Sequence, residues 1–309
     1  MKFNCVISNP PYQNSNGGGS IYPDFFNKCY RFSDEYIIFI CPDRWVFSNK
    51  DKAITTMRNN VIKSNNLDKL VHIISNKGES FVFEGASPND LTYFLVDKDK
   101  NSGCYSAKEF DPDGVLLESS TLNLSDFYFS RTCRNIFKKI SEKCCENMKG
   151  ITCALSHSEV DTLDSVKSSP VKNNECTLKV YGNGGSFAYV PESVLRNDYS
   201  LYRESYKVLL ARNGVGATIA ESDTLASRSC YMIRLGSKDE AENCRSYLET
   251  KFFRFLLKVL KNGIVTPADA FEKIPRLDFD KAWDDKAVVK YFGFNENEAD
   301  YISMLSKYM

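Results

Sequence analysis

The sequence predicts an α/β fold in which a mainly parallel sheet is followed by a second domain of mixed α and β structure. Strand-like apolar runs alternate with helix-like segments over the first third of the 309 residues. Beyond residue 130, a basic helical segment, hairpin-like strands and a long amphipathic helix follow one another. A chain of this length is enough for one large domain or two ordinary ones, and the change of pattern favours two.

The first third of the chain contains the predicted sheet. The continuous apolar run YIIFIC is closed by Pro42 and Asp43, which is typical of a buried parallel strand. Pro23 is well placed in the first turn of a helix. Because no helix separates the last strands, the sheet is expected to end in an antiparallel hairpin. Strands are predicted over 2–8, 36–45, 70–75, 80–83 and 90–99, and helices over 21–32 and 52–62.

A polar, turn-rich stretch over 100–130 marks a candidate domain boundary. We therefore predict a first domain over 1–112, a basic helical connector over 113–150 and a second domain over 151–309. Ser237 with Glu240 has the pattern of a capping box. In this part of the chain helices are predicted over 131–150, 238–261 (ended by Asn262-Gly263) and 296–309 (capped by Asn295), a hairpin over 177–190, and strands over 206–217 and 229–235.

The composition restricts the classes of protein. No apolar run approaches 18 residues and no secretory cleavage site follows the start, so a cytoplasmic protein without a membrane partner is expected. Lys and Arg balance Asp and Glu at 40 each, which neither marks nor excludes a nucleic-acid-binding protein. The 11 cysteines form no CxxC pair, and neither His72 nor His157 lies in a ligand pattern. We expect reduced thiols, structural histidines and no metal site.

The motif Asn9-Pro10-Pro11-Tyr12 has a chemical mechanism attached to it. The exocyclic amine of a base is a poor nucleophile because its lone pair is delocalised into the ring. The side-chain oxygen of Asn9 and the backbone carbonyl of Pro10 can accept its two N–H hydrogens and so localise the lone pair. Tyr12 offers a flat face on which an extruded base can stack. The alternative is a Pro-Pro turn that merely ends a strand.

Several sequence blocks, in order, resemble the adenine-specific DNA methyltransferases of restriction–modification systems, in the branch whose catalytic motif precedes the target-recognition domain. The resemblance covers nearly the whole chain and starts with ISNPPYQ, which looks like the catalytic loop. It implies a partial Rossmann-like methyltransferase sheet followed by an α+β target-recognition domain. The other blocks are SIYPDFF, YIIFICPDRWVF, GESFVFEGASPNDLTYFLVDKD, LKVYGNGG, YKVLLARNGVGA, AENCRSYLETKFFRFLL and a tail from IPRLDF to ISML.

This resemblance implies a role for each segment. Residues 1–112 are expected to be the C-terminal half of a methyltransferase catalytic domain, and 151–309 the target-recognition domain with a C-terminal tail. Asn14–Ser20 is expected to form either a mobile flap over the base or a plain flexible loop. By the same resemblance, Asn9, Pro10, Pro11 and Tyr12 are the target-base residues.

The resemblance also implies S-adenosylmethionine as cofactor, but the sequence shows no evident site for it. In the family a glycine-rich cofactor turn precedes the catalytic motif by far more than the eight residues that precede Asn9 here. Gly214–Gly216 imitates such a turn only superficially, and Gly182–Gly185 is typical of a hairpin turn. We therefore expect a separate subunit to supply the cofactor-binding half.

Two functions remain open from the sequence. The first is a DNA adenine methyltransferase chain that needs its cofactor half in trans. The second is a non-catalytic DNA- or protein-binding remnant or decoy of such an enzyme. Both imply double-stranded DNA as a partner, with base contacts from loops around 182–187 and 212–217. Phosphate contacts are expected from Arg131, Arg134, Lys138, Lys139, Arg203, Lys207 and Arg212.

Overall fold

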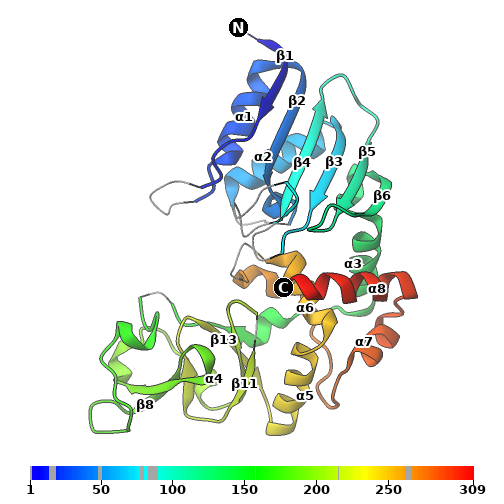
Figure 1. The fold of residues 1–309 in the computed structure, drawn as a ribbon. Helices are drawn as coiled ribbons and strands as arrows, with labels where there is room; N and C mark the ends of the chain where they lie inside the picture. Colours follow the sequence, from blue (N-terminus) through cyan, green and yellow to red (C-terminus); the bar gives the residue numbers. More distant parts are fainter. Residues whose placement is uncertain are drawn as a thin grey trace. The chain divides into compact units, whose positions relative to one another are not determined.

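A computed structural model describes residues 2–13, 19–47, 51–76, 80–82, 90–156, 158–214, 216–261 and 266–309. The chain forms two compact units, one of residues 1–138 with Tyr308 and one of residues 139–307 with Met309. The division falls within helix α3, Arg131–Lys143. This helix is shorter than the one predicted over 131–150, because residues 144–146 have no helical structure and a 3-10 turn begins at Met148. The fold is of mixed α and β structure with several sheets, as Figure 1 shows.

The N-terminal unit is built on one mixed sheet. Its six strands are β1 Phe3–Ser8, β2 Ser33–Pro42, β3 Leu67–Ile73, β4 Leu91–Asp97, β5 Cys104–Phe110 and β6 Leu116–Asn123, in the order β1-β2-β4-β3-β5-β6. The pairs β1–β2 and β3–β5 are parallel, and the other three are antiparallel. The sheet is therefore not mainly parallel, because β4 runs between β2 and β3 in the opposite direction.

Most predicted elements of this unit are confirmed, but the region after residue 80 differs. Ser80–Val82 form no strand, and Phe83 lies outside the described residues. Two strands, β5 and β6, occupy the stretch over 100–130 that was expected to be turn-rich. The β6 sequence LLESSTLN is largely polar because most of its side chains are at least partly exposed, so its composition resembles that of a loop.

Two helices, α1 Tyr22–Phe32 and α2 Lys52–Lys63, lie on one face of this sheet (Figure 1). Pro23 lies in the first turn of α1, as predicted, and the Asp51 carboxylate caps α2 by accepting from two backbone N–H groups. Between helices and sheet lies an aromatic core that includes Phe26, Phe39 and Phe94. Burial of this core is what holds the strand ends in place.

The opposite face of the sheet carries exposed apolar side chains. Ile7 of β1 is 74% exposed, and Tyr36 of β2 and Tyr93 of β4 are 39% and 44% exposed. Pairing in register places Ile7 beside Ile38, and Ile40 beside Tyr93. Among the described residues, β1 pairs only with β2, so its outer edge has no strand partner. We call Ile7, Tyr36, Ile38, Ile40 and Tyr93 the outer sheet face.

The C-terminal unit contains two smaller sheets. One has the order β11-β10-β13-β7 and consists of β7 Thr152–Cys153, β10 Tyr206–Ala211, β11 Ala217–Ala220 and β13 Cys230–Leu235. The other has the order β12-β8-β9 and consists of β8 Leu178–Tyr181, β9 Phe187–Val190 and β12 Thr224–Ala226. The predicted hairpin over 177–190 is confirmed, since β8 and β9 are antiparallel neighbours.

The helices of this unit are α4 Ser200–Arg203, α5 Lys238–Leu248, α6 Lys251–Leu260, α7 Asp285–Phe292 and α8 Glu296–Leu305. The prediction of a single helix over 238–261 is wrong, because α5 and α6 are separate helices. Thr250 has an extended backbone and its hydroxyl accepts from the Phe253 N–H, so it ends one helix and caps the next. The predicted caps Ser237 and Asn295 are confirmed. Asn262-Gly263 lies outside the described residues.

Shorter 3-10 turns join these elements: η1 Asp43–Val46, η2 Leu124–Asp126, η3 Met148–Ile151, η4 Leu163–Ser165, η5 Asn183–Gly185, η6 Glu192–Val194, η7 Ala268–Glu272 and η8 Ser306–Tyr308. Both tryptophans, Trp45 and Trp283, are buried in the cores of their units. In the described part of the chain, the helices are too short or too polar to cross a membrane.

Candidate active site

Several polar side chains of the N-terminal unit lie at one edge of its sheet, where strands end. The register of the strands brings together the C-terminal ends of β1, β2 and β3 and the start of β4. Asn9-Pro10-Pro11-Tyr12 follows β1, Asp43 follows β2, and Asp90 precedes β4. His72 lies next to the end of β3. In open α/β sheets, ligands bind outside the carboxyl ends of the strands, so this edge is the candidate site.

The loop after β1 presents Asn9 and Tyr12 at its surface. Asn9 and Pro11 are exposed, Pro10 is buried and Tyr12 is partly buried. The Tyr12 hydroxyl donates a hydrogen bond to the side-chain oxygen of Asn9, over 3.0 Å. Burial, together with the nearby thiol of Cys41, raises the pKa of Tyr12 to about 12, so this hydroxyl keeps its proton at neutral pH. Asn9 and Tyr12 thus lie together at an accessible position, whereas Pro10 between them is buried.

The chain after Tyr12 turns back upon itself. The Ile21 N–H donates to the Tyr12 carbonyl over 3.2 Å, and Gln13 and Ser20 form an antiparallel bridge. The ring of Tyr12 packs edge-on against that of buried Tyr22, with centroids 6.5 Å apart. These contacts fix both ends of the predicted flap, whose residues 14–18 lie outside the described part of the chain.

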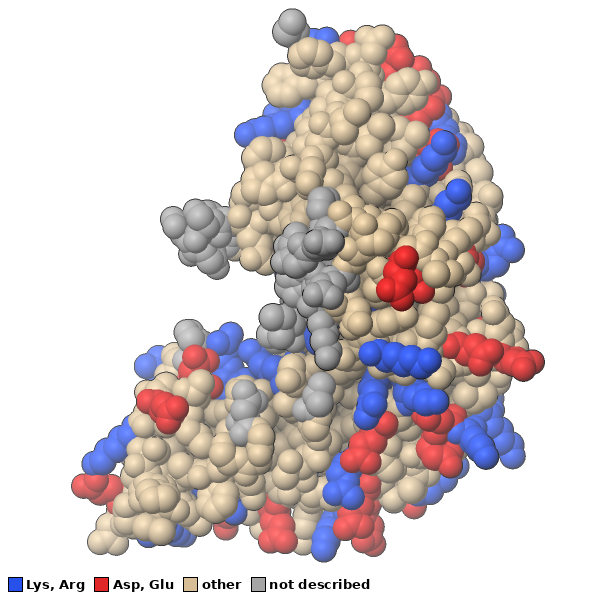
Figure 2. Space-filling view, in the orientation of Figure 1, with Lys and Arg blue, Asp and Glu red and all other residues tan. Residues whose placement is uncertain are grey.

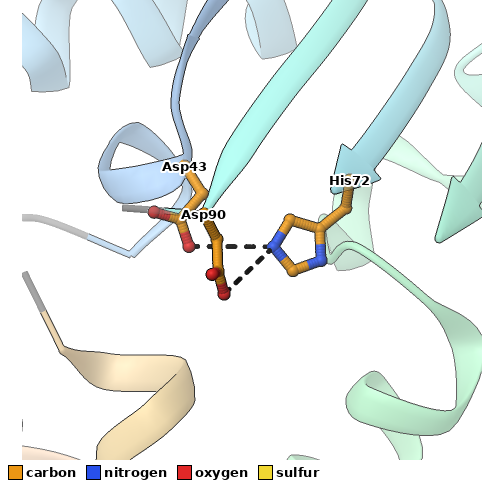
Figure 3. A group of neighbouring side chains, drawn as sticks. All are labelled: Asp43, His72 and Asp90. Atoms are coloured by element: carbon orange, nitrogen blue, oxygen red, sulfur yellow. Dashed lines mark ion pairs between the residues drawn. The ribbon is translucent and has the colours of Figure 1, made fainter. Parts of the chain in front are cut away.

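A second group of side chains lies at the same edge and was missed by the sequence analysis. Nε2 of His72 is 3.8 Å from Oδ2 of Asp43 and 3.8 Å from Oδ2 of Asp90. The dashed lines in Figure 3 mark these two ion pairs. On the other side of the ring, Nδ1 of His72 is 2.8 Å from Oε1 of Glu109 on β5. All four residues are buried, with 8%, 4%, 8% and 0% exposure for Asp43, His72, Asp90 and Glu109. We call Asp43, His72 and Asp90 the His72 cluster.

The electrostatics of the cluster are dominated by its carboxylates. Burial by itself lowers the pKa of His72, but the carboxylates of Asp43, Glu109 and Asp90 outweigh it and raise this pKa to about 9. A separation of 3.8 Å is too long for a hydrogen bond, so Asp43 and Asp90 act on Nε2 through their charge. These residues lie far apart in the sequence, so the sequence analysis did not predict the carboxylates around His72. His157, the other histidine, lies outside the described residues.

The predicted phosphate-binding residues are divided between α3 and the C-terminal unit, and their surroundings differ. In α3, Arg131 is exposed and Arg134 is 3.7 Å from Asp126, whereas Lys139 donates to Glu298 over 2.6 Å. In the C-terminal unit, Arg203 pairs with Glu192 and Asp223. The remaining members are Lys138, which is exposed, and Arg212, whose guanidinium lies over the Tyr231 ring at 5.1 Å.

Lys207 does not agree with the prediction of a phosphate contact. Its side chain is fully buried, and its ammonium group donates to the Glu221 carbonyl over 2.8 Å. Burial lowers the pKa of Lys207 to about 8. A group enclosed in this way cannot reach a DNA phosphate. On the face of the C-terminal unit seen in Figure 2, Lys and Arg are interspersed with Asp and Glu. This face therefore shows no large patch of positive charge alone.

Neither glycine segment fits S-adenosylmethionine. Such a cofactor turn joins a strand to a helix, with the helix N-terminus beside the ligand. Gly214 and Gly216 instead lie between the antiparallel strands β10 and β11. Gly182–Gly185 joins the antiparallel strands β8 and β9. A Cβ at Gly214 would lie 2.6 Å from the Leu257 side chain, so the backbone is enclosed by packing at this position.

Comparison with known proteins gives matches to one group of enzymes. Residues 1–81 match the family model described as Eco57I restriction-modification methylase. A Mycoplasma pneumoniae protein described as an uncharacterized adenine-specific methylase is 27% identical over 148 residues, which cover 45% of this chain and 34% of that protein. These matches confirm the predicted resemblance to the methylases of restriction–modification systems.

Solved structures of restriction enzymes are also similar to the chain. The type IIL restriction-modification enzyme MmeI, solved in complex with DNA, has a TM-score of 0.47 and 10% identity over 98% of this chain and 56% of its own. The type IIG restriction endonuclease BpuSI has a TM-score of 0.39 and 13% identity over 99% of this chain and 53% of its own. TM-scores below 0.5 do not establish a shared fold. The chain spans about one third of the curated relative and about half of these two structures.

Proposed function

Because residues 1–81 match the Eco57I restriction-modification methylase family, we propose that this chain holds the target adenine of DNA during methyl transfer to its exocyclic amine. The observation that carries this proposal is the exposed side chain of Asn9, hydrogen-bonded to Tyr12 at the C-terminal end of β1. Accessible hydrogen-bond acceptors beside an aromatic ring are what an extruded base requires.

The chemistry assigned to the loop follows from its atoms. The amide oxygen of Asn9 has two lone pairs, of which one accepts from Tyr12 and the other is left for an N–H of the base. The carbonyl of Pro10 is the proposed second acceptor, and both prolines fix the backbone that carries it. The Tyr12 ring supplies a stacking surface of the kind that is worth about 1–3 kcal/mol per base. These contacts orient the amine and localise its lone pair.

The methyl donor is proposed to be S-adenosylmethionine, bound by a second polypeptide. In the described part of this chain, neither the turn at Gly182–Gly185 nor the one at Gly214 and Gly216 fits that cofactor. The proposed docking site for the second polypeptide is the outer sheet face together with the free edge of β1. Ile7, at 74% exposure, lies at the junction of that edge and that face. An unpaired edge beside exposed apolar side chains favours association over solvent exposure.

Methyl transfer from labelled S-adenosylmethionine to DNA tests this proposal directly. The full chain is assayed alone and together with the polypeptide encoded next to it. Transfer is expected only for the mixture, and Asn9→Ala is expected to abolish it while DNA affinity changes by less than a few-fold. Asn101→Ala, the same substitution at an exposed position between β4 and β5, is the matched control and should retain activity. Absence of transfer from every wild-type mixture would favour the non-catalytic DNA- or protein-binding alternative.

A further inference from the structure

We propose that Asp43, His72 and Asp90 bind a divalent metal ion, with Nε2 of the histidine and one oxygen of each carboxylate as ligands. This inference does not depend on methyl transfer. It starts from the three potential ligand atoms, which all lie within 4.8 Å of one another. Figure 3 shows the two carboxylates directed at the same ring nitrogen, one from the end of β2 and one from the start of β4.

The ring nitrogen that faces the carboxylates has no hydrogen-bond partner. Nε2 of His72 is buried and accepts or donates no hydrogen bond among the described residues. An unsatisfied buried nitrogen is uncommon and requires an explanation, such as an ion. The two Oδ2 atoms at 3.8 Å leave room between them and the nitrogen. Two ligands bound to one ion at roughly 2.1 Å are separated by about 3–4 Å, so only small side-chain movements are needed.

Neighbouring residues hold His72 and Asp90 in the required orientation. Glu109 is 2.8 Å from Nδ1 of His72, so in the neutral ring a proton on Nδ1 can be shared with Glu109 while Nε2 binds an ion. The imidazole also stacks on Phe129, with centroids 3.8 Å apart and planes 8° from parallel. The N–H and hydroxyl of Ser75 both donate to Oδ1 of Asp90, over 2.8 and 3.0 Å, while its Oδ2 is 3.8 Å from Nε2 of His72.

The balance of charge also favours a cation. When ionised, Asp43, Asp90 and Glu109 bring three buried negative charges to one imidazole. A bound cation lowers the cost of keeping several carboxylates in a buried site, so the composition of the cluster favours an ion.

The ligand types indicate which ion is bound. One imidazole and two carboxylates suit Mn²⁺ or Zn²⁺, whereas Ca²⁺ prefers six to eight oxygens. Three protein ligands leave at least one position for water or a further ligand. Bound there, the ion would tie the ends of β2 and β3 to the start of β4, at the edge where Asn9 and Tyr12 lie.

Titration of the full chain with Mn²⁺ tests this site. Binding is measured as the loss of the free-ion signal in electron paramagnetic resonance. Mn²⁺ is the appropriate probe because the 11 cysteines, none of which forms a disulfide bond, would compete for Zn²⁺. One ion per chain is expected to bind, with an increase in melting temperature. His72→Gln and Asp90→Asn should each weaken binding by about 100-fold or more, and Glu109→Gln by about 10–100-fold.

The matched control is Asp68→Asn, which removes a carboxylate from β3 that pairs with Lys100 at the surface. It should leave Mn²⁺ affinity within about twofold, and circular dichroism shows whether each variant is folded. If His72→Gln fails to fold, Glu109→Gln and Asp90→Asn still decide the question. No Mn²⁺ binding by the wild-type chain, or equal binding by all folded variants, would overturn the proposal.

Discussion

The hydroxyl of Tyr12 donates a hydrogen bond to the side-chain oxygen of Asn9, over 3.0 Å. The two residues are three positions apart, and the intervening prolines restrict the backbone that brings them together. The bond orients the Asn9 amide before any base arrives, so the acceptor needs little reorganisation when an amine binds. Pre-orientation of this kind reduces the cost of binding.

Two substitutions at Tyr12 separate this orienting role from stacking. Tyr12→Phe keeps the ring and loses the hydrogen bond, whose net contribution is about 0.5–1.5 kcal/mol, so methyl transfer should fall by less than about tenfold. Tyr12→Ala also loses the stacking surface and should reduce transfer by a further factor of about 5–150. Single-turnover transfer by the assembled enzyme, with 2-aminopurine fluorescence at the target position, measures both effects. Equal losses in the two variants would contradict a stacking role for Tyr12.

The outer sheet face gives a prediction about association. Ile7→Glu places a charge at the centre of the proposed docking site and should weaken association with the partner polypeptide at least about tenfold, or 1.4 kcal/mol. Because Ile7 is 74% exposed, the stability of the isolated chain should change by no more than about 0.5 kcal/mol. Leu201→Glu, at a 61% exposed position of the C-terminal unit, is the control. Sedimentation of the mixture measures association, and equal affinity for both variants would exclude this face.

The extent to which the sequence predicted the fold depends on how local each signal is. The strands β1 and β2, the helix at Pro23 and the cap at Asn295 were predicted because their patterns lie within a few residues. The strand β6 was missed because its partner β5 supplies the pairing and its own side chains are mostly polar. The boundary between α5 and α6 at Thr250 was missed because threonine also occurs in the middle of helices. Its role as the cap of α6 is visible only in the structure.

The same contrast applies to the candidate site. Asn9-Pro10-Pro11-Tyr12 is contiguous, so its composition alone indicated a chemistry. The His72 cluster is assembled from three segments by strand register, and a lone histidine in an apolar strand gave no indication of it. Lys207 was wrongly assigned to the surface, because a lysine in an apolar strand does not show whether its ammonium group finds a buried carbonyl. Long-range contacts therefore account for both errors.

The basic residues of α3 give a prediction about DNA binding. Arg131 is exposed, so Arg131→Gln should weaken binding to all DNA sequences alike. It should also reduce, by about one, the slope of the logarithm of the binding constant against the logarithm of the salt concentration. Lys139 is already bound to Glu298, so Lys139→Gln should leave DNA affinity unchanged and reduce stability by about 1–2 kcal/mol. Binding titrations over a range of salt concentrations and urea unfolding measure the two effects. A steeper loss of affinity for Lys139→Gln than for Arg131→Gln would contradict this assignment.

Glu159 gives a prediction about pH. Its carboxylate is 5% exposed and accepts from the Tyr199 hydroxyl over 2.7 Å and from the N–H groups of Arg196 and Ser156 over 2.9 and 2.8 Å. Burial alone would raise the pKa of Glu159, but these hydrogen bonds outweigh it and lower this pKa to about 2.

A carboxyl group whose pKa is lower in the folded state stabilises the protein at pH values above its ordinary pKa, which is 4.5 here. This stabilisation is lost as the pH falls towards the folded-state pKa of about 2. Glu159→Gln should therefore destabilise the chain by about 2–3 kcal/mol at pH 7. The difference from wild type should shrink steadily between about pH 4.5 and 2. Urea unfolding of both proteins over this pH range measures it, with Glu175→Gln, at an exposed ion pair, as the control. A difference that stays constant with pH would show that Glu159 stabilises the fold by packing and not by its charge.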